Sequence, residues 1–446
     1  MFHTLNAPDN GVNAHAICRG WLIYLSLLML IPWATTQAEQ TGHTLTLSSA
    51  IKYSLEQNPS LRVFEFRNIV LMGKKETANL SPAYEAGFEA ENFSGSGNYK
   101  GLDSTELTVS LSSVIEMGDK RTARINIVDG SRALLDAERQ IEALELLAEV
   151  TRRYVDVLAA QERVTLAEEA AQLAEDTLYE VKKRSKAGAI PEAEVKRAQA
   201  AAGQARLTVS SEKQQLSYFK VALAALWGER APLFSKVEGN LFQFGEDVEF
   251  QRLYTRVAQN PAIQIFATEE RLKEAEVRLA RTQASTDIRW SVGLRQFQET
   301  DDTAITAGFN VPLFSSKRST GSTTSAIAAR DEVFIRKEVA LLKLHTQLFR
   351  AYSNRQQAIF TFKELQSSII PSLEQALKET QKAYQRGRYS YLDYLTARQE
   401  LITARRTLID AASAALRYGA DIEQLTAEPL SASQYDSFNK YPGLSQ

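Results

Sequence analysis

Two patterns of hydrophobic and polar residues follow each other along this chain, one with the period of a helix and one with the period of a strand. Residues 47–80 have the helical pattern, which is interrupted at Asn58-Pro59. Ser48 is the expected N-cap of the first helix, and Pro59 fits the first turn of the second. The segment therefore predicts two helices that meet at Asn58.

Two later segments, about 84–115 and about 287–314, alternate with period two and predict one β-hairpin each. Their strands have one apolar and one polar face, which fits a soluble sheet with one wet side. Strand length and pattern also fit a transmembrane barrel with aromatic residues at the membrane interface: Tyr84, Trp290, Phe309 and Phe314. Because four strands cannot close a barrel, this interpretation requires strands from several chains.

A very long helical pattern follows each hairpin. Residues 120–186 contain no proline and a single glycine, so at 1.5 Å per residue the helix would be about 100 Å long. Its return partner is expected at 192–227. In the second copy the helix is expected from about 325 to 386, with Pro371 as an interior break, and its partner at 389–425. Helices of this length need coiled-coil neighbours.

The apolar residues of the first long helix step by three and four in two stripes. One stripe is formed by Ile141, Leu144, Ala148, Thr151, Val155 and Leu158, and the other by Leu147, Val150, Tyr154, Val157, Gln161 and Val164. Two stripes suit a wall of helices with a neighbour on each side, whereas one broad buried face would suit an ordinary bundle. The helix length favours the wall.

Short motifs recur in the same order at an offset of about 200 residues, which indicates an internal duplication. The recurring pairs are Gln57-Asn58-Pro59 with Gln259-Asn260-Pro261, Gly118-Asp119-Lys120-Arg121 with Ser315-Ser316-Lys317-Arg318, and Lys186-Ala187-Gly188 with Gln385-Arg386-Gly387. The predicted organisation is a signal peptide (1–38), a first repeat (39–228), a linker (229–246), a second repeat (247–426) and a polar tail (427–446). Each repeat contains one β-hairpin and one helical hairpin, the latter at about 118–227 and about 317–425.

The N-terminus and the composition indicate an exported protein. An apolar run from Trp21 to Trp33 follows Arg19 and precedes a small-residue site at Ala38, as in a secretory signal peptide; an uncleaved anchor is the alternative. The only cysteine, Cys18, precedes this run, so the mature chain is expected to lack thiols and a lipid-bearing cysteine. The net charge of −2 argues against a nucleic-acid-binding surface.

The plan of signal peptide, duplication and one strand hairpin per long helical hairpin resembles the TolC family of outer-membrane factors. The local motifs are most similar to the heavy-metal efflux branch, the CzcC-like and CusC-like proteins. They are the segments Leu55–Pro59, Ile115–Arg121, Asp156–Arg163 and Ala187–Pro191. The resemblance implies a homotrimer in the outer membrane: twelve strands in one barrel, continued into the periplasm by an α-helical coiled-coil tunnel.

The resemblance also implies a function. The protein would be the exit duct of a tripartite efflux pump, passively conducting heavy-metal cations delivered by an inner-membrane RND transporter and a periplasmic adaptor. A duct for drug efflux or type I protein secretion would have the same fold. A periplasmic coiled-coil adaptor would explain the helices but not the aromatic-bearing hairpins.

The turns of the helical hairpins are the candidate functional site. Gly188 and Gly387 fit left-handed helix stops, and by resemblance these turns form the periplasmic tip that gates the duct and docks the adaptor. Six residues beyond each glycine lies a carboxylate, Glu194 or Asp393, which could ring the opening and favour cations. The alternative role of these carboxylates is to complement helix dipoles. Three arginines are placed to pair with them or to stabilise helix C-termini: Arg184, Arg386 and Arg388.

The mature chain offers little for catalysis or metal ligation. It contains only His43 and His345 as imidazoles and has no methionine cluster, so no soft or imidazole metal site is visible. No nucleophile–base pair and no phosphate-binding glycine loop is apparent. We therefore expect no cofactor and no enzymatic activity, and a partner must supply the energy for transport.

Overall fold

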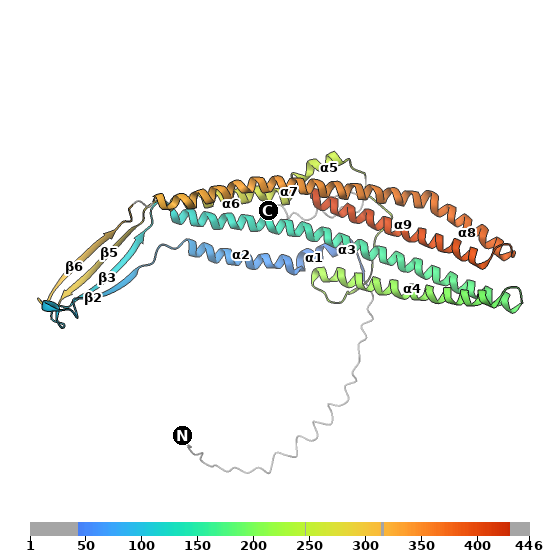
Figure 1. Ribbon diagram of the computed structural model, residues 1–446, viewed down its shortest axis with the longest axis horizontal. Helices are drawn as coiled ribbons and strands as arrows, with labels where there is room; N and C mark the ends of the chain where they lie inside the picture. Colours follow the sequence, from blue (N-terminus) through green and yellow to red (C-terminus); the bar gives the residue numbers. More distant parts are fainter. Residues whose placement is uncertain (1–42, 246, 314–315, 429–446) are drawn as a thin grey trace, which may run out of the picture. The chain divides into compact units, whose positions relative to one another are not determined.

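The computed structural model describes residues 43–245, 247–313 and 316–428. Within these ranges the chain is mainly helical, with one four-stranded sheet and one two-stranded sheet (Figure 1). The predicted signal peptide lies outside the described residues, as does most of the predicted tail. None of the helices in the described ranges combines the length and the hydropathy of a membrane span.

The first two helices, α1 (Leu47–Gln57) and α2 (Pro59–Ala78), meet at Asn58 as predicted. The N-cap of α1 is Thr46, whose hydroxyl accepts a hydrogen bond from the Ser49 amide at 3.2 Å. The expectation that Ser48 is the cap was wrong, because Ser48 already lies within the first turn of the helix.

The recurring Gln-Asn-Pro motif has the same structural role in both repeats. The Oδ1 atom of Asn58 caps α2 by accepting from the Ser60 amide, and its Nδ2 donates to the carbonyl of Leu226 at 2.7 Å. Asn260 caps α6 (Pro261–Thr282) and donates to the Gln424 carbonyl at 2.8 Å. Each asparagine thus starts one helix and binds the end of another, which explains why an asparagine precedes each proline.

Four antiparallel strands form the larger sheet in the order β2-β3-β5-β6. The strands are β2 (Glu85–Glu91), β3 (Glu106–Ile115), β5 (Ile288–Phe297) and β6 (Asp302–Asn310). Both predicted hairpins are present, and the pairing of β3 with β5 joins them into one sheet. Strands β2 and β6 are its two edges.

The register gives this sheet two chemically different faces. One row of paired positions contains the apolar residues Phe88, Val109, Leu294 and Ile305. The adjacent row on the opposite face contains Glu89, Thr108, Arg295 and Ala304. On that polar face Arg295 forms ion pairs with Glu91 at 2.8 Å and Glu106 at 2.9 Å. The apolar face has no covering element in the described chain, and its large side chains are exposed.

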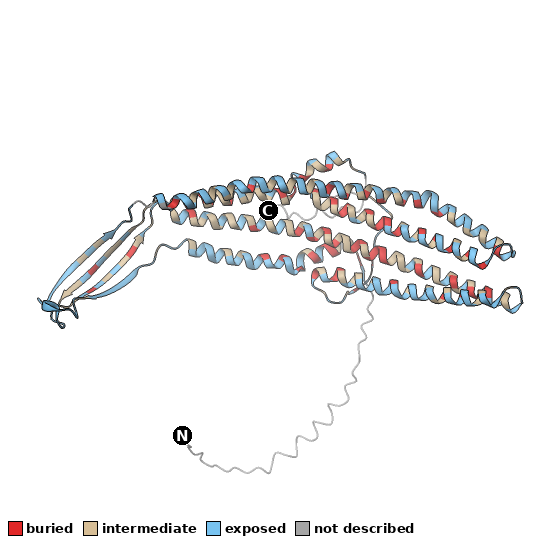
Figure 2. Ribbon diagram, viewed as in Figure 1, coloured by how far each residue is buried: buried red, intermediate tan, exposed pale blue. Residues whose placement is uncertain are grey.

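The longest helix, α3 (Lys120–Lys186), has the bounds predicted from the sequence. It pairs with α4 (Glu192–Ala224), which ends in a short 3₁₀ turn (Ala225–Trp227), and it also contacts α2, α6 and α9 (Tyr391–Thr426). Around its middle, consecutive residues such as Val157, Leu158 and Ala159 are all buried. This part of α3 therefore has neighbours on every side, whereas α2 and α7 expose long faces (Figure 2).

In the second repeat, α5 (Phe250–Val257) precedes α6, and the long helical stretch is α7 (Ser316–Glu364) followed by α8 (Ile370–Gln385). The helix begins at Ser316, which agrees with the hairpin bound of about 317 and shows that the expected start of the long helix at about 325 was too late. The break predicted at Pro371 is a π-helical turn over Leu365–Ile369, immediately before the proline. Such a turn accommodates an extra residue without ending the helix.

The segment predicted as a linker, 229–246, contains strand β4 (Phe234–Val237), which pairs with β1 (His43–Leu45). The side-chain amide of Gln161 on α3 exchanges two hydrogen bonds with the backbone of Val237, at 2.8 and 3.1 Å. The Tyr154 hydroxyl lies 2.8 Å from the Leu45 carbonyl oxygen. These contacts place β4 in the main buried cluster around the middle of α3.

Candidate functional site at the tips of the helical hairpins

Both helical hairpins turn with the same backbone geometry. After α3, Gly188 has a φ of +72°, its amide donates to the Ser185 carbonyl, and the Ala189 amide donates to the Arg184 carbonyl. After α8, Gly387 has a φ of +73°, with the equivalent bonds to Tyr384 and Ala383. This pair of bonds is the Schellman motif, which requires a left-handed residue where glycine is least strained.

The helices that follow the two turns begin differently. In α9 the Ser390 hydroxyl accepts from the Asp393 amide at 3.2 Å, and the Asp393 carboxylate accepts from the Ser390 amide at 2.9 Å. The Ser390 hydroxyl also lies 2.7 Å from the Asp393 carboxylate, and the hydrogen bonds that this carboxylate accepts from the Ser390 hydroxyl and amide hold the pKa of Asp393 below its usual range. In α4 the N-cap is Pro191, which provides no capping side chain. Asp393 therefore caps its own helix, as the dipole alternative predicted.

Glu194 occupies the equivalent position in α4, but its carboxylate has different surroundings. Its Oε2 atom is buried and has no hydrogen-bond partner in the described residues. The carboxylate lies near the Tyr384 side chain of α8, and burial together with this negative charge raises the pKa of the Tyr384 hydroxyl. Glu194 thus faces the other hairpin rather than its own helix end.

Arg184, at the end of α3, also reaches the second hairpin through Tyr384. Its guanidinium carbon lies 4.8 Å from the centroid of the Tyr384 ring, and its Nη1 donates to the Tyr384 carbonyl at 3.4 Å. An arginine over an aromatic face is a favourable cation–π contact. Arg184 and Glu194 of the first hairpin therefore both lie against Tyr384 of the second hairpin. The two tips of one chain are joined around this residue.

Three tyrosines form the centre of this contact. Tyr384 stacks on Tyr394 with ring centroids 5.8 Å apart and an interplanar angle of 11°, and it meets Tyr391 at 6.0 Å. They pack against small and apolar residues of the first hairpin: Ala174, Leu178, Val181, Ala198 and Ala202. These tyrosines were not predicted as part of the site. Their positions close to Gly387 in the sequence were the signal that could have indicated them.

The predicted ion pairs at the tip do not form within one described chain. Arg184 is bound to Tyr384, and Arg386 and Arg388 are exposed residues of the second turn. Across the described ranges, none of the three arginines lies within ion-pair distance of Glu194 or Asp393. In the same ranges no group of three or more His, Cys, Asp or Glu could hold a metal ion.

Comparison with known proteins identifies the family. The family model described as "Outer membrane efflux protein" matches residues 78–229 and 253–428. The chain belongs to this family. This efflux protein is accordingly an outer-membrane duct and not an enzyme, and the architecture predicted from the sequence, mainly helical with two strand hairpins, is confirmed. The alternative of a periplasmic adaptor was wrong, because the matched family consists of efflux ducts.

Individual relatives agree with this assignment. The efflux protein is 27% identical to the cobalt-zinc-cadmium resistance protein CzcC of Cupriavidus metallidurans over 298 residues, which are 67% of this chain and 71% of CzcC. Its fold is similar to that of CusC, with a TM-score of 0.70, 16% identity and coverage of 86% and 92% of the two chains. The fold of VceC from Vibrio cholerae gives a TM-score of 0.65 at 19% identity, over 86% and 97%.

Proposed function

We propose that the efflux protein is the exit duct of a tripartite pump that exports heavy-metal cations, working with a periplasmic adaptor and an inner-membrane transporter of the RND type. The observation that carries the choice of substrate is the 27% identity to a protein named for cobalt, zinc and cadmium resistance, over two thirds of the chain.

We propose further that the working unit is a homotrimer. The sheet of one chain has two open edges, β2 and β6, whose unpaired backbone groups can pair with the sheet of another chain. Closure removes both edges, and three sheets of four strands would close into one ring of about twelve strands. The apolar face of that ring would then meet lipid, and the face that carries Arg295 and its glutamates would line the lumen.

Helices α2 and α7 also have exposed apolar faces that neighbouring copies of the chain could cover. On α2, Phe66 and Ile69 expose 63% and 61% of their surface. On α7, Phe334, Val339 and Leu342 expose 64%, 60% and 70%. Apolar rows of this kind are unusual on a monomeric surface and typical of an interface. Copies packed side by side along these rows would form the helical tunnel.

We propose that the contact around Tyr384 is the periplasmic gate of the duct. It joins the two helical hairpins of one chain, so its loss would allow α8 and α9 to move away from α3 and α4. Glu194 is half-buried in this contact and adds negative charge to the opening, whereas Asp393 is exposed and held by Ser390. The single-channel conductance of Tyr384 variants tests this role.

The function is tested by deleting the gene in its native host and measuring minimal inhibitory concentrations. We expect greater sensitivity to Co²⁺, Zn²⁺ or Cd²⁺, restored by the intact gene, and unchanged sensitivity to organic antibiotics. Sensitivity to antibiotics alone would assign the duct to drug efflux. Loss of a secreted protein with normal metal tolerance would assign it to type I secretion.

A further inference from the structure

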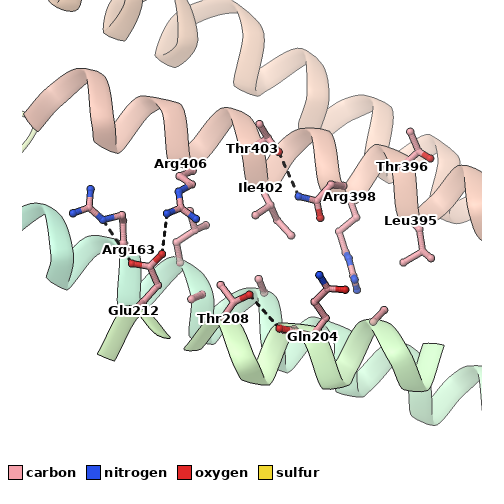
Figure 3. A pocket seen from close by; sticks show the side chains of 16 residues that line it. Arg163, Gln204, Thr208, Glu212, Leu395, Thr396, Arg398, Ile402, Thr403 and Arg406 are labelled. Carbon is pink, nitrogen blue, oxygen red and sulfur yellow. Dashed lines mark hydrogen bonds and ion pairs between the residues drawn. The ribbon is translucent and has the colours of Figure 1, made fainter. Parts of the chain in front are cut away.

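A pocket between the two helical hairpins lies next to the tyrosine cluster of the tip, because its lining residues Ala205 and Leu395 also pack against that cluster. It has a volume of about 580 Å³ and is lined by residues of α3, α4 and α9 (Figure 3). Part of its wall is apolar, with Leu166 and Ala170 from α3, Ala201 and Ala205 from α4, and Leu395 and Ile402 from α9, and the rest is polar or charged. Three arginines and one glutamate are the charged residues of the lining: Arg163, Arg398, Arg406 and Glu212.

Two of these arginines are already neutralised. Glu212 is 8% exposed and lies 3.0 Å from Arg406 and 3.7 Å from Arg163. Arg163 also binds Asp410 at 2.9 Å. A carboxylate between two guanidinium groups is a satisfied arrangement, so this end of the pocket needs no further anion.

Arg398 is different, because it is buried without a partner. It is 7% exposed, it extends from α9 toward Gln204 of α4, and its Nη1 atom has no hydrogen-bond partner (Figure 3). In the described part of the chain it forms no ion pair, and Glu212 is held by Arg163 and Arg406. A buried, unpaired charge is costly, and a guanidinium cannot lose its proton to avoid that cost. Arg398 therefore presents a positive charge to the pocket that no side chain of the described residues neutralises.

We propose that this pocket binds a small amphiphilic monoanion, an organic carboxylate with a short apolar body. The carboxylate would accept hydrogen bonds from the Arg398 guanidinium, whose planar fork matches the two oxygen atoms. The apolar body would lie against Leu166, Leu395 and Ile402. One unpaired cation beside the apolar part of the lining favours a single negative charge joined to hydrocarbon, rather than a metal cation or a fully hydrated anion such as phosphate.

Binding would connect the two helical hairpins of the chain. The pocket takes Arg398 and Ile402 from α9 and Gln204 and Ala205 from α4, so a bound molecule contacts both. A ligand that binds the folded arrangement stabilises it in proportion to its occupancy. This inference does not depend on which substrate the duct exports.

The test uses the assembled full-length protein in lipid nanodiscs and isothermal titration calorimetry with three six-carbon probes: hexanoate, hexan-1-ol and hexylammonium. We expect saturable binding of hexanoate and no comparable binding of the other two. Arg398→Met, which keeps the length and apolar volume of the side chain, should weaken hexanoate binding by about tenfold or more, the effect of a lost charge-assisted hydrogen bond. Arg197→Met on an exposed position of α4 should leave binding unchanged.

A second measurement separates this site from a structural ion pair with a neighbouring chain. If Arg398 is unpartnered in the assembly, ligand-free Arg398→Met should unfold at the same temperature as wild type or higher, since removing a buried unpaired charge is not destabilising. A markedly lower unfolding temperature would show that another chain supplies the anion and would overturn the proposal. It would equally be overturned by no hexanoate binding to wild type, or by equal binding of hexanoate to Arg398→Met or of hexan-1-ol to wild type.

Discussion

At the residue scale, two carboxylates at equivalent places in the two repeats have acquired different tasks. Glu194 has a buried oxygen and faces Tyr384 of the other hairpin, whereas Asp393 is exposed and accepts two hydrogen bonds from Ser390. The difference arises from the N-cap residue, three positions before each carboxylate. Ser390 can complete a capping box and Pro191 cannot. A ring built from these positions would therefore contain two kinds of carboxylate.

The first prediction concerns ion selectivity. Glu194→Gln and Asp393→Asn remove one negative charge each without changing side-chain size, and negative charge around a narrow opening favours cations. We expect each variant to lower the cation-to-anion permeability ratio of single channels in planar bilayers, and the double variant to lower it further. Equal selectivity in the wild type and the double variant would exclude an acidic opening. Glu192→Gln, an exposed carboxylate outside the contact around Tyr384, is the matched control.

The second prediction separates the ring of Tyr384 from its hydroxyl. The hydroxyl has no hydrogen-bond partner in the described residues, whereas the ring stacks on Tyr394 and carries Arg184. Tyr384→Ala should therefore weaken the contact between the hairpins and raise the mean single-channel conductance. Tyr384→Phe should conduct like wild type, because stacking and the cation–π contact remain. The gate proposal fails if Tyr384→Ala also conducts like wild type.

The third prediction concerns pH. The pKa of Asp393 is lowered in the folded protein by its hydrogen bonds from Ser390, so its contribution to the first turn of α9 is complete above the ordinary value of 3.8. That contribution is lost as the pH falls through the lowered value in the folded state. Hydrogen exchange of this turn should thus be faster in Asp393→Ala than in wild type at neutral pH, and this difference should shrink as the pH falls below 3.8. A difference that persists unchanged in acid would contradict the capping role.

Counting residues from Gly188 and Gly387 was enough to find Glu194 and Asp393. Their surroundings could not be predicted, because Tyr384, which Glu194 faces, lies 190 positions away on α8 and is brought close by the packing of the hairpins. Arg386 and Arg388 were expected to pair with these carboxylates only because their charges are opposite. The structure shows that Asp393 is bound within its own turn by Ser390.

At the element scale, the hydrophobic pattern predicts the bounds of long helices accurately. It predicts elements less accurately where contacts between distant parts of the chain determine whether they form. The bounds of α3 followed from an unbroken helical pattern. The start of α7 was placed late because residues 316–324 are rich in Ser, Thr and Gly, which have weak helix propensity, yet they are helical in the structure. Strand β4 was missed because its pairing partner β1 lies 191 residues earlier in the chain, counted from strand start to strand start.

The fourth prediction uses two glycines of the same helical hairpin. Gly188 has a φ of +72° and open space around it, so Gly188→Ala should destabilise the turn by about 1 kcal/mol through backbone strain alone. Gly203 lies within α4 with no atom near the added Cβ, so Gly203→Ala should stabilise that helix by about 0.5–1 kcal/mol. Hydrogen-exchange free energies of the two segments measure both effects. Similar effects at both positions would contradict the Schellman turn.

At the scale of the whole molecule, one chain is incomplete by itself. Its sheet has two unpaired edges and an uncovered apolar face, and α2 and α7 expose apolar rows. The strand count alone leads to the same conclusion, since four strands cannot close into a barrel. The register adds which side chains belong to which face, and this makes the assembly testable at single positions.

The last prediction compares two consecutive residues of the edge strand β6. Ile305 is 78% exposed and lies on the apolar face opposite Leu294, whereas Thr306 lies on the polar face opposite Gly293. If the apolar face meets lipid in a closed trimer, Ile305→Lys places a charge in the membrane at a cost of about 2–4 kcal/mol per chain near the midplane. Thr306→Lys places the same charge in the lumen at little cost.

We therefore expect Ile305→Lys to reduce the amount of trimer recovered from the outer-membrane fraction, as measured on unheated gels. Thr306→Lys should assemble like wild type, although its backbone position in β6 is adjacent. Because both variants add one lysine to the same edge strand, a general effect of charge on folding or export would reduce both equally. Only a sheet whose two faces meet lipid and water, respectively, separates them.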